Sequence, residues 1–577
     1  MSTNQQFTVD LSSASSGYID IQMKILALGE VPEIEVALPV WTPGSYLVRE
    51  YAQFLTQMHA KDDSGGKRKV TKVTKSVWVI DCHQTTEINI SYRLYGQTLN
   101  VRYNHFDSSH AFVHGPATFL YLKQSAEASP ISVEIVNTNW EITTGLKKIG
   151  PHTFLADDYD MLIDCPLEIG DNEAIAFEVL GTPHRFEFWG EGNFDAEQIA
   201  VDTQKIITSA ADIFDAKLPY DSFSFITHLT EKDYGGLEHR NSTALMVPRD
   251  SFREGPMHKD ASKEDTKYRQ FLGLVSHEFF HTWNVKRIKP AAFNHFDYQN
   301  ENYTRDMWTV EGITSYYDDL ILRRAGLISR DTYLEGVAKM ITRLESIPGR
   351  LISSLEDASF DTWIRLYRPH AVNHNSNVSY YLKGSLVSLL LDLKIRSSSR
   401  DSARGKSLDD VMHFLWTHHS GDTGYGEGSY ESIVEKVCDI DCKSFFDRFI
   451  RGCSDPDWNT HFAPFGLTLN WESDPQPYLG AALSENRVKT VDDGSPALGK
   501  LHPGDEILAV DGKRFSSDMD ALLKTYNVGQ SLTMTGFRNG TLFSVEIELG
   551  EGRAGKYGFE ILDNLKEETR QLRNAWI

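Results

Sequence analysis

The chain has 577 residues, and its 58 Lys and Arg residues stand against 81 Asp and Glu residues, giving a formal net charge of −23 with His neutral. This acidic balance disfavours nucleic acid and anionic membranes as partners, because both are bound through an excess of Lys and Arg. With 40% hydrophobic and 24% charged residues, the composition is that of a globular chain, and the length corresponds to about three or four domains.

The amino-terminal residues 1–17 are polar and lack both the basic region and the apolar core of a secretory signal peptide. No run of about 18 apolar residues occurs, so we expect no membrane-spanning helix. The five cysteines contain no CxxC pair and are expected to be buried thiols rather than metal ligands. Together these features predict a reducing, cytoplasmic location.

Two different hydrophobic periods divide the first 460 residues. Up to about residue 185, short β-rich segments alternate with Gly, Pro, Asn and Asp turns, which predicts an antiparallel β domain over residues 1–185. From about residue 195 the spacing of apolar residues becomes helical, with a strand-like interval at 222–248. We therefore predict a mainly α-helical domain over residues 186–460, and a multidomain α+β protein overall.

Strands return after residue 463, and residues 494–515 (GSPALGKLHPGDEILAVDGKRF) resemble part of a PDZ domain. The resemblance implies a PDZ domain over residues 461–563, followed by a tail, 564–577, that we expect to be a short helix. Residues 477–483 (PYLGAAL) occupy the place of the family's carboxylate-binding loop but depart from its glycine-rich pattern. Peptide C-termini are therefore possible partners, for which we expect weak binding or none.

The motif HEFFH, residues 277–281, lies in a long helical segment. On a helix, His277 and His281 project from one face, the arrangement that lets two imidazoles bind one zinc ion. Glu278 lies beside them and is placed to take a proton from an attacking water. This pattern predicts a metallopeptidase site.

A catalytic zinc site needs a third protein ligand and keeps one position open. Glu311 is the candidate, thirty residues after His281 and at the start of another apolar-periodic helix. Ser315 and Asp318, at i+4 and i+7 on the same face, are candidates to hold a ligating imidazole. The alternative for Glu311 is a residue that simply favours a helix N-terminus.

Two further segments contain residues suited to a peptidase. Tyr381, in YYLKG at the head of a helix, is a candidate to stabilise an oxyanion, although an adjacent tyrosine in an apolar helix more often packs in a core or an interface. Gly235 and Gly236 allow a substrate backbone to approach closely, and Glu238 is a candidate partner for a free α-ammonium. The alternative for this GGLE segment is a turn with a surface glutamate.

The sequence contains, in this order, GGLE, HEFFH, a helical Glu and YLKG. This order of motifs resembles that of the gluzincin metallopeptidases of the aminopeptidase N and leukotriene A4 hydrolase group. Two departures matter: Leu237 and His239 replace the Met and Asn of that group's exopeptidase motif, and the gap to the third ligand is longer. The chain resembles the glycyl aminopeptidase family more closely. The segments that carry this resemblance are residues 41–51 (WTPGSYLVREY), 277–290 and 308–317, with the trailing PDZ-like segment.

This resemblance implies a β-rich domain, a thermolysin-like catalytic domain and a PDZ domain. It also implies one Zn²⁺ per chain, peptide substrates with a free N-terminus, and release of N-terminal residues with Gly and Ala favoured. Carried over by position, the zinc ligands are His277, His281 and Glu311, and the general base is Glu278. The oxyanion-stabilising tyrosine is Tyr381, and the amine anchor is Glu238. The alternatives are a thermolysin-like endopeptidase and a PDZ adaptor with an inactive peptidase fold.

Overall fold

The computed structural model describes residues 4–26, 28, 31–123, 129–252, 266–398, 405–421, 423–472, 476–552, 555–562 and 565–577. The chain forms two compact units. One contains Met1–Tyr303, Tyr317–Ile328 and Met412–Gly426, and the other contains Thr304–Tyr316, Ser329–Val411 and Glu427–Ile577. Within the described ranges, we find no helix with the length and apolar character needed to cross a membrane.

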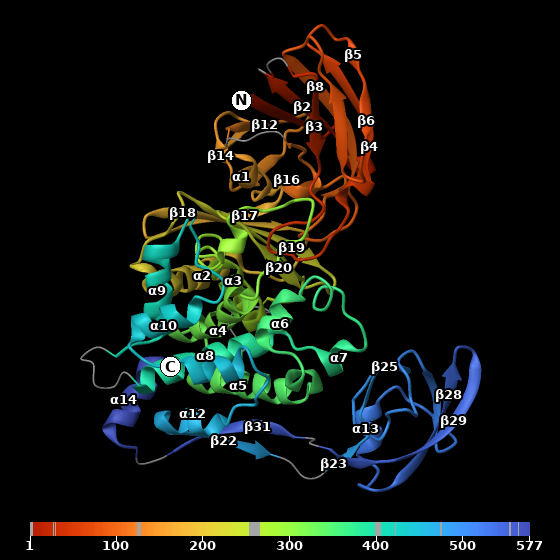
Figure 1. The fold of residues 1–577 in the computed structure, drawn as a ribbon, viewed down its shortest axis with the longest axis vertical. Coiled ribbons are helices and arrows are strands. Elements are labelled where there is room, and N and C mark those ends of the chain that lie inside the picture. Colours follow the sequence, from red (N-terminus) through yellow and green to blue (C-terminus); the bar gives the residue numbers. More distant parts are fainter. Residues whose placement is uncertain are drawn as a thin grey trace. The chain divides into compact units, whose positions relative to one another are not determined.

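The first unit begins with the β-rich region drawn in red and orange in Figure 1. Its largest sheet has the order β14-β15-β12-β1-β2-β8-β4-β5. Alternate residues of β2 and β8 are buried, so each strand presents one face to the core. The bounds are β1 Asn4–Asp10, β2 Tyr18–Leu26, β4 Leu55–Asp62, β5 Lys67–Arg68, β8 Glu87–Tyr95, β12 Ile131–Val136, β14 Lys147–Lys148 and β15 Thr153–Ala156.

The prediction of an antiparallel β domain needs one correction. β1 pairs with β12 in parallel, whereas the other neighbours in this sheet are antiparallel. A parallel pair requires a long connection between its two strands. Here the chain between β1 and β12 contains all strands of one further four-stranded sheet and two strands of another. Their strands are β13 Glu141–Thr144, β16 Leu167–Gly170, β10 His110–Val113 and β9 His105–Phe106 in one, and β11 Tyr121–Leu122, β3 Glu33–Ala37, β7 Val77–Asp81 and β6 Val70–Lys72 in the other.

The first unit also contains a five-stranded sheet of order β17-β18-β19-β21-β20. β18, β19 and β21 are parallel, and the two edge strands are antiparallel to their neighbours. The boundary expected at residue 185 falls inside β18. The division of the chain into the expected domains stays a prediction. The bounds are β17 Glu173–Val179, β18 Thr182–Trp189, β19 Phe223–Thr230, β20 Gly235–Glu238 and β21 Ser242–Pro248, with helices α2 Ala196–Ala211 and α3 Thr266–Phe280.

The second unit contains the predicted helical region around α8, which is buried along nearly all of its length. A π-helical turn, Trp308–Gly312, precedes α4 and packs against α8. Helix α4 itself continues from the second unit into the first at Tyr316–Tyr317. The helices are α4 Ile313–Arg324, α5 Arg330–Glu345, α6 Leu355–Phe360, α7 Asn373–Ser376, α8 Tyr380–Ser398, α9 Leu408–His419, α10 Tyr430–Cys438, α11 Lys443–Phe449 and α12 Trp458–Phe462.

The C-terminal part of the second unit is a small β module with its own apolar core, which includes Val488, Ile507 and Leu532. The assignment of a PDZ domain to it stays a prediction. The predicted tail helix is present as α14 (Glu567–Trp576), which buries Trp576 beside Phe465. The strands are β22 Leu467–Glu472, β23 Gln476–Tyr478, β24 Ala481–Ser484, β25 Arg487–Val491, β26 Glu506–Val510, β27 Lys513–Arg514, β28 Ser531–Arg538, β29 Thr541–Glu548, β30 Gly550–Gly552 and β31 Lys556–Ile561, with the short helix α13 Met519–Leu523.

Candidate active site

Helix α3 and the turn after it carry the HEFFH motif in the first unit. Phe279 and Phe280 are fully buried, and their rings pack against Phe223 and Tyr317 respectively. Burial of these two large side chains fixes the rotation of the helix about its axis. The histidine at position 277 is consequently held on a different face, toward the partly exposed surface.

The two histidines of the motif converge on one point. Their Nε2 atoms lie 3.2 Å apart. His281 Nδ1 lies 2.6 Å from the carbonyl oxygen of Asn284, and His277 Nδ1 lies 3.5 Å from Asp318 Oδ2. Because both Nδ1 atoms face acceptors, we assign the ring protons there, which leaves a lone pair on each Nε2. Two Zn–N bonds at a tetrahedral angle place their nitrogens about 3.3 Å apart, so this pair fits a zinc ion.

The second glycine of GGLE allows β20 to lie against the glutamate of the motif. A Cβ atom on Gly236 would clash with the Glu278 carboxylate, so a larger residue here would displace that side chain. The carboxylates of Glu238 and Glu278 and a ring nitrogen of His281 lie within 4.8 Å of one another. The structure therefore brings together five of the predicted site residues in the first unit, namely Gly236, Glu238, His277, Glu278 and His281.

Glu238 is an unusual carboxylate. Its side chain is only 3% exposed, and its Oε1 atom has no hydrogen-bond partner among the described residues. Lys286 donates a hydrogen bond to Asp164 Oδ1 at 2.7 Å. Burial lowers the pKa of Lys286, but the negative charges of Asp164 and Glu238 outweigh this effect and raise it. A buried carboxylate without a full set of donors is costly. The site is therefore suited to receive one further cationic donor.

Glu311 and Tyr381 lie together in the second unit. Gly312 and Gly384 let the π-helical turn and α8 pack backbone to backbone, since a Cβ on Gly312 would lie 2.7 Å from the Gly384 Cα. Glu311 is 2% exposed. Burial and the charge of Glu311 raise the pKa of the Tyr381 phenol well above its usual value. Tyr381 is therefore a protonated hydrogen-bond donor at neutral pH.

The chain is similar to known peptidases in two segments of its sequence and in its fold. The family model described as the peptidase M61 N-terminal domain matches residues 6–171, and that of M61 glycyl aminopeptidase matches residues 270–387. The crystal structure of an aminopeptidase N family protein from Idiomarina loihiensis is 26% identical, covers 99% of both chains and has a TM-score of 0.90. An M1 zinc metallopeptidase from Deinococcus radiodurans bound to a Tyr-Ser-Ala substrate is 13% identical, covers 79% of this chain and 94% of its own, and has a TM-score of 0.47. No curated protein matches.

The fold and the paired histidines define a metallopeptidase. The chain belongs to the M61 glycyl aminopeptidase family, which confirms the resemblance seen in its motifs, and it is a metallo-aminopeptidase.

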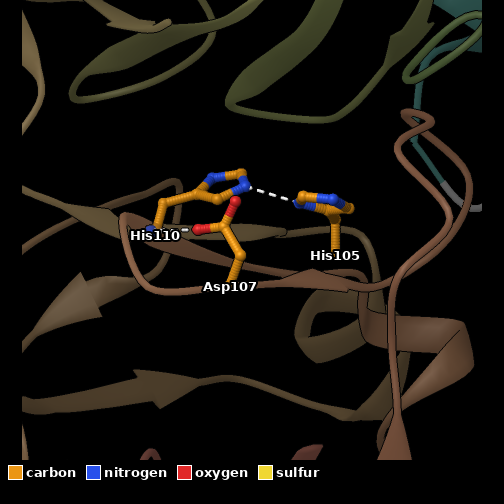
Figure 2. Close-up of side chains that lie close together, drawn as sticks. All are labelled: His105, Asp107 and His110. Atoms are coloured by element: carbon orange, nitrogen blue, oxygen red, sulfur yellow. Dashed lines mark hydrogen bonds between the residues drawn. The ribbon is translucent and has the colours of Figure 1, made fainter. Parts of the chain in front are cut away.

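A second cluster of histidine and carboxylate side chains, residue types that can bind metal ions, lies elsewhere in the first unit (Figure 2). His105 Nδ1 and His110 Nε2 are 2.7 Å apart, and the His110 backbone N–H donates to Asp107 Oδ1 at 3.0 Å. His110 Nδ1 and His228 Nε2 lie 2.8 and 2.9 Å from the two carboxylate oxygens of Glu168. These distances are those of hydrogen bonds. The group is a buried hydrogen-bonded chain that joins β9, β10, β16 and β19.

Removing the carboxylate at the centre of this chain is expected to destabilise the fold. Burial favours the neutral carboxyl, but the charge of His110 and the hydrogen bonds from both imidazoles outweigh it and hold the pKa of Glu168 well below its usual value. Its stabilising contribution is therefore present above about pH 4.3 and is lost as the pH falls further. We expect Glu168→Gln to lower the free energy of unfolding by about 3–5 kcal/mol at pH 7.

Urea unfolding at pH 7 and near pH 3.5 measures this effect. The difference between wild type and Glu168→Gln should narrow at the lower pH, and the exposed Glu178→Gln should match wild type at both. A difference that does not change with pH would contradict the assignment of a charged Glu168.

Proposed function

We propose that this metallo-aminopeptidase uses zinc to remove the first residue of peptides, with Gly and Ala preferred. One observation carries the proposal: the buried, incompletely paired carboxylate of Glu238 lies within 4.8 Å of Glu278 and His281 ligand atoms. This distance suits a free α-ammonium on Glu238 and the first peptide bond at the reacting centre. The Gly and Ala preference rests on the family to which the chain belongs.

In this proposal His277, His281 and Glu311 hold the zinc ion. The lone pairs on the two Nε2 atoms support the first two ligands. Glu311 precedes Asp318, the partner of His277, by seven residues, which is about two helical turns and hence one face of the helical segment. When bound, zinc supplies Lewis acidity, which acidifies a water and polarises a carbonyl.

The protein side chains then have separate roles. Glu278 takes a proton from the attacking water and passes it to the nitrogen of the departing amine. Tyr381 donates a hydrogen bond to the carbonyl oxygen as that oxygen gains negative charge. Glu238 binds the α-ammonium, so the bond that reacts is the first one in the peptide.

Glu238→Gln tests the role of the carboxylate in amine recognition. We expect kcat/KM for glycyl and alanyl amides to fall about 10- to 100-fold, mainly through KM, because a charge-assisted hydrogen bond is replaced by a neutral one. Initial rates on these amides and on their N-acetylated forms measure the effect. Glu231→Gln, an exposed residue a short distance upstream, is the matched control and should resemble wild type.

The same measurement separates the proposal from its alternative. An endopeptidase would cut N-acetylated substrates as well as free ones, and Glu238→Gln would change neither rate. That outcome would show that Glu238 is not an amine anchor and would favour the endopeptidase.

A further inference from the structure

A turn from the N-terminal β region lies directly against the carboxylate of Glu238. A Cβ atom on Gly44 would lie 2.6 Å from both carboxylate oxygens, closer than a Cβ atom approaches a non-bonded oxygen. Gly44 also has φ of +85°, in the left-handed region that favours glycine. The Glu238 carboxylate therefore occupies the space that a side chain at position 44 would fill.

The N-terminal β region also makes hydrogen bonds to the residues that flank Glu238, at two points. Arg102 Nη2 donates to the Gly236 carbonyl oxygen at 2.7 Å. Asp164 accepts from the Arg240 backbone N–H at 2.9 Å and from Lys286 at 2.7 Å. Residues on both sides of Glu238 are thus fixed by contacts from the N-terminal β region.

The Glu238 carboxylate borders both the reacting centre and a cavity. Glu278 and His281 lie within reach on one side, whereas a cavity of about 490 Å³, lined by residues that include Gly44, Glu238 and Lys286, lies on another. The cavity lining does not include His277, Glu278 or His281. A side chain at position 44 would therefore displace the Glu238 carboxylate from its place beside the reacting centre.

We propose that the Pro43–Gly44 turn is part of the amine-recognition site, and that Gly44 is a positioning residue that sets the location of the Glu238 carboxylate. The inference rests on the proposed role of Glu238. By fixing the distance between the anchor and the reacting centre, the turn restricts cleavage to substrates whose free α-ammonium belongs to the residue being removed. The N-terminal β region thereby contributes to exopeptidase specificity.

Gly44→Ala tests this inference, with Gly65→Ala as its control. Gly65 has φ of +83° and lies in the same β region, but a Cβ there would meet no atom within 4 Å. Both variants thus introduce the same backbone strain, and only Gly44→Ala touches Glu238. We expect Gly44→Ala to lower kcat/KM for glycyl amides about tenfold relative to Gly65→Ala, mainly through KM, with zinc content unchanged.

A double-mutant cycle shows whether Gly44 acts through Glu238. In the Glu238→Gln background, adding Gly44→Ala should lower kcat/KM less than about twofold, because the interaction is already lost. Equal kinetics for Gly44→Ala and Gly65→Ala, or an undiminished effect in the Glu238→Gln background, would overturn the role of Gly44. If Glu238→Gln itself left free-amine cleavage unchanged, the proposed function would fail instead, so the two failures are distinguishable.

Discussion

Glu278→Gln is expected to lower kcat for glycyl amide hydrolysis by about 10²–10⁴-fold, the contribution typical of a general acid–base group. The amide has nearly the same shape as the carboxylate, so it keeps the contact with Gly236, but it cannot accept the proton of the attacking water. Zinc content and unfolding temperature should stay close to those of wild type. Steady-state rates on a glycyl amide, with metal analysis of the same samples, measure the effect.

The matched control is Glu335→Gln, the same substitution at an exposed position of α5. It should leave kcat unchanged. A zinc-loaded Glu278→Gln variant that retains more than a tenth of wild-type activity would remove Glu278 from the proposed proton transfer.

Loss of a zinc ligand has the second large effect. We expect His281→Ala to reduce bound zinc from one per chain to a small fraction and to abolish measurable hydrolysis, because one imidazole and one carboxylate are too few protein ligands to hold the ion tightly. Glu311→Gln should also lower zinc occupancy, since a neutral amide is a poor replacement for a carboxylate ligand. Metal analysis after dialysis against a weak chelator measures both. His83→Ala, at a surface position, should retain one zinc.

The two variants test different parts of the site. Full zinc retention by His281→Ala would contradict the histidine pair itself. Full retention by Glu311→Gln, together with loss in His281→Ala, would leave the pair in place and exclude Glu311 as the third ligand.

The part of the site that could be predicted from the sequence is the part fixed by local geometry. The spacing of His277 and His281 on one helix determines that their rings share a face, and the structure places their Nε2 atoms 3.2 Å apart. Asp318, expected to support a ligating imidazole, contacts His277. The two glycines before Glu238 were expected to admit a substrate backbone. The structure places Gly236 against the Glu278 side chain, and the close approach of a substrate stays a prediction.

The parts that could not be predicted depend on contacts between distant segments. Arg102 and Gly236 are 134 positions apart, and Lys286 and Asp164 are 122 apart. Periodicity and turn signals describe neighbours in sequence, so they carry no information on such pairs. The WTPGSY segment carries a family resemblance, but no local signal in it predicts the packing of Gly44 against Glu238. The parallel pairing of β1 with β12 likewise depends on the path of the intervening chain.

The most direct test of zinc aminopeptidase activity compares one substrate with and without its free amine. Zinc-loaded wild type should hydrolyse glycyl and alanyl chromogenic amides and leave the N-acetylated forms intact, because only the free substrates present an ammonium to Glu238. Equal cleavage of both forms would contradict the aminopeptidase account and favour an endopeptidase. Cleavage of neither form by the zinc-loaded protein would contradict activity on these small first residues.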